Sequence, residues 1–321
     1  MRTSLWVRRA ASFCALGILL AACGTSQPVL NLPDAAQHRS GAQQNGSAAL
    51  LYVGNKQSIE MYGFPSGVQR GSLHSPGIVR GMCSDSNGNV FVAAAPPKSS
   101  KSDSGSVYEF AHGGKAPIAT LQAPKHDVPI ACSSDSVTGN LAVTNQNSRN
   151  FTPSVSIYAN AAGTPTVYTS RAIGANPQGG YDDSGNLFVT SGGNLGVLLP
   201  KGAADFTKIT LTKTLGGVDH VQWDGTYFAL QSFDALGHNG EKLFERVFRV
   251  QISGSTGRVV NATHFIGWPE ANPGQSWIDG STIVATPYDS ISFWNYPAGG
   301  KAVKVIHPGH PGKAVTVSLV P

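Results

Sequence analysis

The sequence predicts an all-β domain built from short antiparallel strands that close into a ring. Three observations support this fold class. A strand–turn–strand motif recurs about every 41 to 55 residues, apolar and polar residues alternate with period two between the turns, and one C-terminal strand has no repeat unit of its own. No long stretch of the 321 residues has helical periodicity. Repeats of this length predict a β-propeller, here of six four-stranded antiparallel blades closed by the C-terminal strand in the first blade.

The recurring motif predicts the inner hairpin of each blade. In the first copy an apolar strand ends near Asp85, whose carboxylate can accept hydrogen bonds from backbone amides two residues further on. Gly88 can then supply the positive φ that the turn requires, and Asn89 begins the return strand. These aspartates are therefore predicted to stabilise turns rather than to act in catalysis. The five copies span Gly81–Val92, Ile130–Val143, Gly179–Val189, Val221–Ala229 and Ser276–Val284.

Two further strands follow each inner hairpin. Their period-two alternation and the turn residues between them are typical of antiparallel sheet. The predicted third strands are Ser106–Phe110, Ser154–Tyr158, Leu195–Leu199, Arg246–Val250 and Ser290–Trp294, and the predicted fourth strands lie near Ile118–Leu121, Thr166–Thr169, Lys208–Leu211, Val259–Thr263 and Val303–Ile306.

The two ends of the domain complete each other. Leu50–Gly54, Ser58–Tyr62 and Val68–Leu73 are the predicted second, third and fourth strands of a first blade that lacks an innermost strand. The final segment Ala314–Leu319 is a strand with nothing after it, so we expect it to fill this place and close the ring. The count is then six blades. A seventh would require an extra blade within the longer fifth unit, at about residues 218–265.

The N-terminus has the pattern of a bacterial export signal. Three arginines lie among the first nine residues, and the apolar run Ala10–Leu20 is too short to span a bilayer. The stretch Leu20–Cys23 resembles the lipobox of bacterial lipoproteins, which implies cleavage before Cys23 and a lipid such as palmitate on that residue. An ordinary signal peptide with a chance cysteine is the alternative.

This resemblance divides the chain into a signal peptide (1–22), a lipidated cysteine with a disordered tether (23–49) and a propeller domain (50–321). Gly24 follows the cysteine, where an aspartate would imply retention at the inner membrane. We therefore expect an exported protein with a lipid anchor in the cell membrane, at the outer membrane if the cell is Gram-negative. The formal net charge of +5 falls to about +2 without the three leader arginines, which is too small to indicate nucleic-acid binding.

The cysteines also bear on the compartment. Of the four, Cys14 leaves with the signal peptide and Cys23 takes the lipid. Cys83 and Cys132 occupy the same position on the innermost strands of consecutive units, where they can lie close enough for a disulfide. Two cysteines remain, which is an even number, and an oxidising compartment favours a disulfide between them. The alternative is two small buried thiols.

The Asp-x-x-Gly-Asn turns followed by Val90–Val92 or Leu187–Val189 resemble those of NHL-repeat and SMP-30-like six-bladed propellers. This resemblance implies the fold but not the chemistry, since such propellers include binding modules, lactonases and lyases. The metal-dependent lactonases of the SMP-30 group begin with a glutamate-containing segment that ligates calcium. Here the corresponding segment Leu50–Asn55 has no carboxylate, so the sequence departs from that pattern.

A functional site is expected on the face of the ring where loops enter the innermost strands, which we call the loop face. The amide-rich loops on that face, which also include the polar insertion Pro96–Gly105, suit hydrogen bonding to sugars or peptides, and solvated turns are the alternative. Neutral imidazoles and carboxylates there could bind a divalent cation, with His126, Asp127, Asp219, His220 and His310 as the metal candidates. Turn formation before Pro or Gly is the alternative reading of the same residues. The candidate binding residues are His74, His126, Asp127, Asn176, Asp219, His220, Asn272 and His310.

No motif identifies a catalytic residue, because the sequence has no nucleophile elbow, His-Glu-x-x-His or phosphate-binding loop. We therefore expect a monomeric binding module for an envelope protein, peptide or glycan, without a cofactor, that meets the membrane through the lipid on Cys23. The alternative is a lactonase-like, metal-assisted hydrolase or a lyase with one divalent cation, in which His220 or His310 would be the base. A purely structural envelope component is a third possibility.

Overall fold

The computed structural model describes residues 49–234, 245–268, 274–287, 289–308 and 312–320. All of them belong to one compact unit, His38–Pro321. The predicted signal peptide, Cys23 and nearly all of the tether lie outside the described residues, as do the candidates Asn272 and His310. Within the described part of the chain, no helix is long and apolar enough to cross a membrane.

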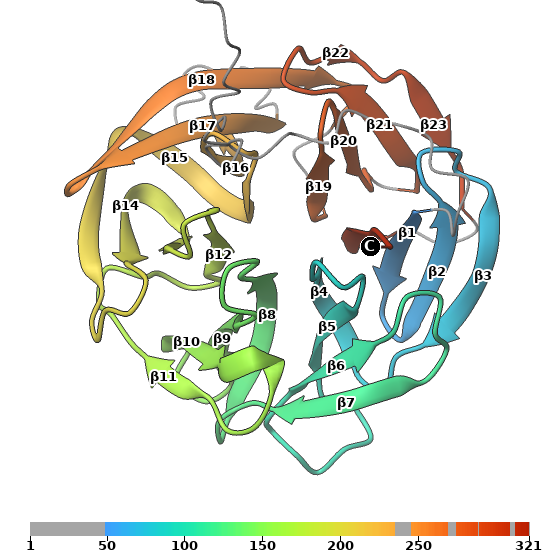
Figure 1. Ribbon diagram of the computed structural model, residues 1–321, viewed down its shortest axis with the longest axis horizontal. Helices are drawn as coiled ribbons and strands as arrows, with labels where there is room; N and C mark the ends of the chain where they lie inside the picture. Colours follow the sequence, from blue (N-terminus) through green and yellow to red (C-terminus); the bar gives the residue numbers. More distant parts are fainter. Residues whose placement is uncertain (1–48, 235–244, 269–273, 288, 309–311, 321) are drawn as a thin grey trace, which may run out of the picture. The chain divides into compact units, whose positions relative to one another are not determined.

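The described residues form an all-β, propeller-like arrangement of mainly antiparallel sheets around a central axis (Figure 1). One short 3₁₀ turn, η1 (Ala159–Ala161), interrupts the strands. Four of the sheets have four strands each. From the axis outward these sheets are β24 (Ala314–Ser318), β1 (Leu50–Asn55), β2 (Ser58–Gly63) and β3 (Gln69–His74); β4 (Ile78–Ser84), β5 (Val90–Ala95), β6 (Ser106–Phe110) and β7 (Pro117–Gln122); β8 (Asp127–Ser134), β9 (Leu141–Asn147), β10 (Pro153–Tyr158) and β11 (Thr166–Tyr168); and β19 (Ser276–Asp279), β20 (Thr282–Ala285), β21 (Ile291–Asn295) and β23 (Lys304–Ile306).

The fifth sheet has eight strands, so the prediction of six separate four-stranded blades is wrong at this point. The strand β15 runs without a break through the expected fourth strand of one blade and the expected first strand of the next. Its first part pairs with β14 and its last part with β16, with register shifts between Leu215 and Val218 and between Val218 and His220. Such bulges let a strand bend while it stays extended. The order is β12 (Gln178–Tyr181), β13 (Leu187–Thr190), β14 (Gly192–Leu199), β15 (Thr207–Trp223), β16 (Phe228–Asp234), β17 (Glu245–Ser253), β18 (Thr256–Ile266) and β22 (Gly300–Lys301).

The predicted closure by the C-terminal strand is confirmed. β24 pairs antiparallel with β1, from Leu50 opposite Ser318 to Gly54 opposite Ala314. All five residues of β24 are buried. The chain end therefore supplies the innermost strand of the sheet that begins the domain.

The turn aspartates also act as predicted. Asp85 accepts hydrogen bonds from the backbone N–H groups of Asn87 and Asn89, at 2.9 and 2.8 Å. Gly88 has a φ of +83°. Asp182 makes the equivalent pair of bonds in the third copy of the motif. The carboxylates thus fix the inner hairpins in the way the sequence indicates.

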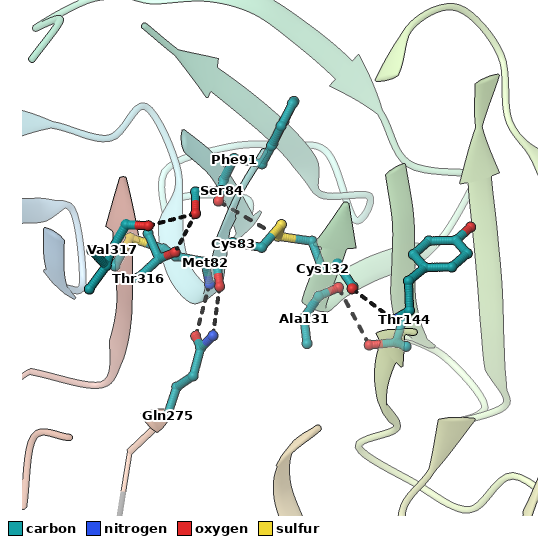
Figure 2. Close-up of a disulfide and its surroundings, with 12 residues drawn as sticks. Met82, Cys83, Ser84, Phe91, Ala131, Cys132, Thr144, Gln275, Thr316 and Val317 are labelled. Atoms are coloured by element: carbon teal, nitrogen blue, oxygen red, sulfur yellow. Dashed lines mark hydrogen bonds between the residues drawn. A yellow bond between two sulfur atoms is a disulfide. The ribbon is translucent and has the colours of Figure 1, made fainter. Parts of the chain in front are cut away.

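Two bonding patterns tie the innermost strands together near the axis (Figure 2). Cys83 on β4 and Cys132 on β8 form the predicted disulfide, with their Cα atoms 5.6 Å apart. The side chain of Gln275, just before β19, accepts from the N–H of Met82 on β4 at 2.9 Å and donates to its carbonyl at 2.6 Å. The side chain of Gln222 likewise accepts from the N–H of Ile278 at 2.8 Å and donates to its carbonyl at 2.7 Å. The amide groups of these glutamines take the place of a neighbouring strand at the innermost edges.

Candidate functional site

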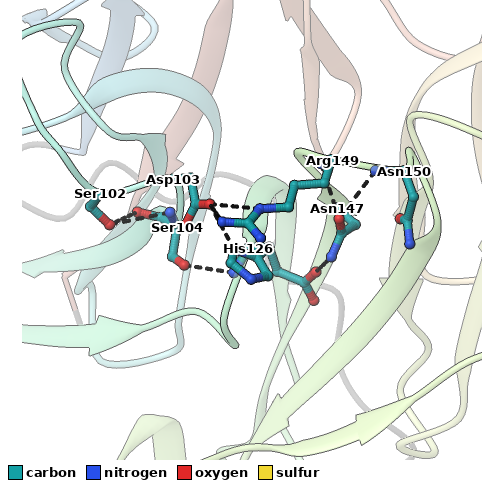
Figure 3. Close-up of polar contacts among 8 residues, drawn as sticks. Ser102, Asp103, Ser104, His126, Asn147, Arg149 and Asn150 are labelled. Carbon is teal, nitrogen blue, oxygen red and sulfur yellow. Dashed lines mark hydrogen bonds and ion pairs between the residues drawn. The ribbon is translucent and has the colours of Figure 1, made fainter.

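One cluster of side chains on the loop face joins three loops around Asp103 (Figure 3). The carboxylate oxygen Oδ2 of Asp103, on the β5–β6 loop, lies 2.7 Å from Nδ1 of His126 and accepts from Nη2 of Arg149 at 2.8 Å. His126 precedes β8, and Arg149 lies on the β9–β10 loop. Partial desolvation opposes ionisation of Asp103, but the bonds from Arg149 and His126 outweigh it and lower its pKa. We call these three residues the Asp103 cluster.

His126 and Asp127 are neighbours in sequence but belong to separate networks. His126 has a φ of +67°, and its backbone N–H donates to Oγ of Ser104 at 2.7 Å. Asp127 is buried and accepts from Oγ of Ser154 at 2.6 Å and from the amide of Asn147 at 3.3 Å. The Asp127 carboxylate is thus engaged within its own sheet. The structure brings His126 to Asp103 rather than to the other metal candidates.

The β9–β10 loop, which contributes Arg149 to the Asp103 cluster, carries two residues that the sequence did not single out as candidates. Phe151 is 68% exposed and has a φ of +59°, which is unusual for an aromatic residue. The side chain of Arg149 is 66% exposed although it pairs with Asp103. A bulky aromatic within an otherwise polar five-residue loop, Ser148–Thr152, was the available signal. This loop therefore offers an apolar group and a cation to a partner.

The remaining loop-face candidates do not join this cluster. His74 is exposed at the end of the outer strand β3, opposite Ser58. Asn176 is exposed, has a φ of +53° and donates its N–H to Oε1 of Gln146 at 3.3 Å, as a turn residue before Pro177 does. Among the described residues, no group of three His, Cys, Asp or Glu side chains is placed to hold a metal ion.

Asp219 and His220 lie on β15, and burial perturbs the pKa values of both. His220 is 4% exposed, and burial lowers its pKa to about 3. Burial raises the pKa of Asp219 to about 6. Neither ring nitrogen of His220 has a hydrogen-bond partner among the described residues. Both groups are therefore held in their neutral forms more strongly than in water.

His220 lines a hollow where the innermost strands end, which is away from the loop face. This cavity, which we call the channel hollow, has a volume of about 220 Å³ and is lined by the Cys83–Cys132 disulfide, Ser133, His220, Trp223 and Trp277, among others. A second hollow of about 480 Å³ adjoins it and shares Ser84, Gln222 and Trp277 with it. Ser133 is near the end of β8 and Asp127 is at its start, about 20 Å away along an extended strand. His220, at this hollow, is thus not brought together with the His126–Asp127 part of the predicted site.

The opposed pKa shifts of Asp219 and His220 predict opposite effects on the pH dependence of stability. The unfolded state protonates His220 below its ordinary value of 6.5 and the folded state only below about 3. The contribution of neutral His220 to the free energy of unfolding is therefore complete above pH 6.5 and is lost as the pH falls towards 3. Folded Asp219 keeps its proton up to about pH 6, whereas unfolded Asp219 ionises near 3.8. Its contribution is complete below pH 3.8 and is lost as the pH rises to 6.

Between pH 4 and 6 the two contributions have opposite slopes of about 1.4 kcal/mol per pH unit and cancel. Relative to the unmodified protein, Asp219→Asn is expected to make the free energy of unfolding rise with pH by about that amount. His220→Gln is expected to make it fall by about the same amount. Urea unfolding at pH 4, 5 and 6 measures these slopes. Variants that both stay parallel to the unmodified protein would contradict the assigned pKa shifts.

Comparisons with known proteins support the fold. No family model and no curated protein matches the sequence. A chain from the crystal structure of a nidogen/laminin complex is similar with a TM-score of 0.57, covering 85% of this chain and 99% of that one at 12% identity. A protein of unknown function from Bacteroides caccae gives a TM-score of 0.56 with the same coverage at 9% identity. At these identities the likeness shows a β-propeller-like fold and nothing about activity.

Proposed function

We propose that this protein is a lipid-anchored β-propeller of the cell envelope that binds an envelope protein, peptide or glycan on its loop face. The observation that carries the proposal is the Asp103 cluster, because one carboxylate holds three loops together at 2.7–2.8 Å while Arg149 and Phe151 stay exposed. Exposed aromatic and arginine side chains on a fixed scaffold are typical binding hot spots. They favour a protein or peptide over a glycan at this position.

The finer description of the domain is part of this proposal. We infer six blade units, with the eight-stranded sheet counted as two, and a relationship to NHL-repeat and SMP-30-like propellers. The five copies of the Asp–Gly turn support this inference. One structurally similar chain comes from a nidogen/laminin complex, which is a precedent for a fold of this kind within a protein assembly. The export signal and the Leu20–Cys23 stretch support the lipid anchor.

Site-specific photo-crosslinking in cells tests the binding face. A photoreactive residue at exposed Asn150 is expected to crosslink to one discrete partner, whereas the same residue at Val137 is not. Val137 is 45% exposed and lies in the β8–β9 turn, where β8 ends, so it is a matched control. Adding Phe151→Ala is expected to reduce the Asn150 crosslink about tenfold or more, since burial of such a side chain contributes about 1.5–3 kcal/mol. Equal labelling from both positions would contradict a loop-face site.

The same strains test the anchor. Cys23→Ser is expected to move the protein from the membrane fraction to the soluble fraction and to abolish incorporation of labelled palmitate. A Cys23→Ser protein that stays membrane-bound would contradict lipid attachment at this residue. That result would leave the crosslinking outcome intact, so the anchor and the binding face can fail separately.

A further inference from the structure

Each of the three loops that meet at the Asp103 cluster carries at least one exposed cation. These cations are Lys98 and Lys101 on the β5–β6 loop, Lys125 on the β7–β8 loop and Arg149 on the β9–β10 loop. All residues of these loops are described, and Asp103 is their one acidic residue. Within the described part of the chain, none of the three lysines forms an ion pair. The loops therefore present an excess of positive charge to solvent.

Hydrogen bonds hold these loops, and therefore the cations, close together (Figure 3). Oδ2 of Asp103 lies 2.7 Å from Nδ1 of His126, and it accepts from Nη2 and Nε of Arg149 at 2.8 and 3.1 Å. Lys101 is two residues from Asp103 in sequence, and Lys125 is next to His126. Two residues of extended chain span about 7 Å. The backbones of both lysines are thus near the Asp103 cluster.

The β9–β10 loop presents Phe151 on a backbone that is fixed by its own hydrogen bonds. The carbonyl of Asn147 accepts from the N–H of Phe151 at 3.0 Å, and its side-chain Oδ1 accepts from the N–H of Arg149 at 3.0 Å. The N–H of Asn147 donates to the carbonyl of Thr152 at 2.9 Å. Phe151 is 68% exposed and has a φ of +59°, a conformation that costs free energy in a bulky residue. A partner would meet an apolar side chain already in place, so little conformational entropy is lost on binding.

The inner turns at the other end of the ring have the opposite charge. The β4–β5, β8–β9 and β12–β13 turns lie away from the loop face, because an antiparallel strand has its two connections at opposite ends. All residues of these turns are described, and none is a lysine or arginine. Their carboxylates are those of Asp85, Asp135, Asp182 and Asp183. An acidic partner is therefore attracted to the loop face and repelled by these turns.

The unused donors and acceptor of the Asp103 cluster indicate a peptide rather than a phosphate group. All three bonds to Asp103 use Oδ2, and its side chain is 42% exposed. Among the described residues, Oδ1 accepts no hydrogen bond, so it can accept one from a peptide N–H. Arg149 uses two of the five N–H donors of its guanidinium group on Asp103, so the others can bind a second carboxylate. A phosphate group could pair with the cations but has no N–H to donate to Asp103.

We propose that the loop face binds an acidic segment of another protein. Carboxylates of the segment pair with Lys101, Lys125 and Arg149, and one of its apolar side chains packs against Phe151. This inference rests on the proposed binding function of the loop face and adds the chemistry of the partner. Charge attraction speeds association and excludes basic partners, whereas burial of Phe151 supplies affinity.

Binding of labelled peptides to the purified protein without its signal peptide tests this proposal. The probe is a short peptide in which glutamates flank one leucine, and its controls have glutamine or lysine in place of glutamate. The glutamate peptide is expected to bind about tenfold or more tightly than either control, and high salt is expected to reduce this difference. Phe151→Ala is expected to weaken the glutamate peptide about tenfold or more. Fluorescence anisotropy measures these affinities.

Charge-reversal variants locate the attraction. Lys101→Glu/Lys125→Glu is expected to weaken the glutamate peptide about tenfold or more, whereas Lys115→Glu/Lys201→Glu is expected to leave it nearly unchanged. Lys115 and Lys201 are exposed on the β6–β7 and β14–β15 loops at the other end of the ring. This control therefore changes the net charge of the protein by the same amount. In cells, only the first variant is expected to reduce the crosslink from Asn150.

Several results would overturn this inference. They are a glutamate peptide that binds no more tightly than the glutamine peptide, equal weakening in both charge-reversal variants, and binding to phosphatidylglycerol vesicles but not to the peptide. The last result would assign the cations to a membrane surface. Urea unfolding shows whether the variants are folded.

The crosslink from Asn150 separates this inference from the proposed function on which it rests. An undiminished crosslink in a folded Lys101→Glu/Lys125→Glu protein would contradict an acidic partner and leave the loop-face function standing. Absence of a crosslink in the unmodified protein would contradict the loop-face function itself.

Discussion

Removal of residues 314–321 is expected to abolish cooperative folding of the propeller domain. β24 is buried at every position and pairs with β1 along five residues. Burial of Val315 and Val317 alone contributes about 3–6 kcal/mol, and loss of the strand leaves the inner edge of β1 unpaired. That sum approaches the whole free energy of unfolding of a typical domain, about 5–15 kcal/mol. Circular dichroism and urea unfolding of the protein without its signal peptide measure the effect.

Two matched chains make the truncation specific. Deletion of residues 320–321, beyond β24, is expected to change the unfolding midpoint little. A permuted chain with residues 312–320 placed before Ala49 is expected to regain the cooperative transition, because Ser318 already lies opposite Leu50 and a short turn can connect them. A truncated protein that unfolds cooperatively at an unchanged midpoint would contradict closure of the ring by this strand.

Loss of the Cys83–Cys132 disulfide is expected to lower the free energy of unfolding by about 4 kcal/mol. The two cysteines are separated by 49 residues in sequence, and chain-entropy estimates for a closed loop of that length give about this value. The bond also joins the innermost strands of two adjacent sheets, so its loss removes a link between them. Urea unfolding of a Cys83→Ala/Cys132→Ala variant measures the difference.

Reduction provides the control for this prediction. A thiol reductant is expected to bring the unmodified protein close to the stability of the double variant, and to leave the double variant unaffected. If the double variant were as stable as the oxidised protein, the bond would have no role in stability. If the reductant destabilised the double variant too, the effect would not come from this disulfide.

The fold was largely predictable because its signals are local. Asp85 and Gly88 specify a turn through their own hydrogen bonds and φ angle, and the motif recurs often enough to define repeat units. The unpartnered C-terminal strand predicted the closure with β1, and the register of the repeats predicted the disulfide. The blade count was the exception, because β15 carries one strand through two predicted units.

The candidate site was predicted only in part, for two physical reasons. A register shift in β15 lies between Val218 and His220, and a bulge of this kind has no mark in a period-two pattern. The Asp103 cluster depends on three loops meeting in space, and Arg149 is 46 residues from Asp103 in sequence. Composition and spacing cannot show such a meeting.

By itself the sequence determined the strands, the Asp–Gly turns and the pair of cysteines, because each depends on neighbouring residues or on the repeat period. Only the tertiary structure decided that His220 is buried beside a hollow where the inner strands end, while His126 binds Asp103 on the loop face. It also decided that Gln275 and Gln222 satisfy the inner strand edges. Each of these contacts joins residues from different sheets or loops, so it depends on how those elements pack and not on the local sequence.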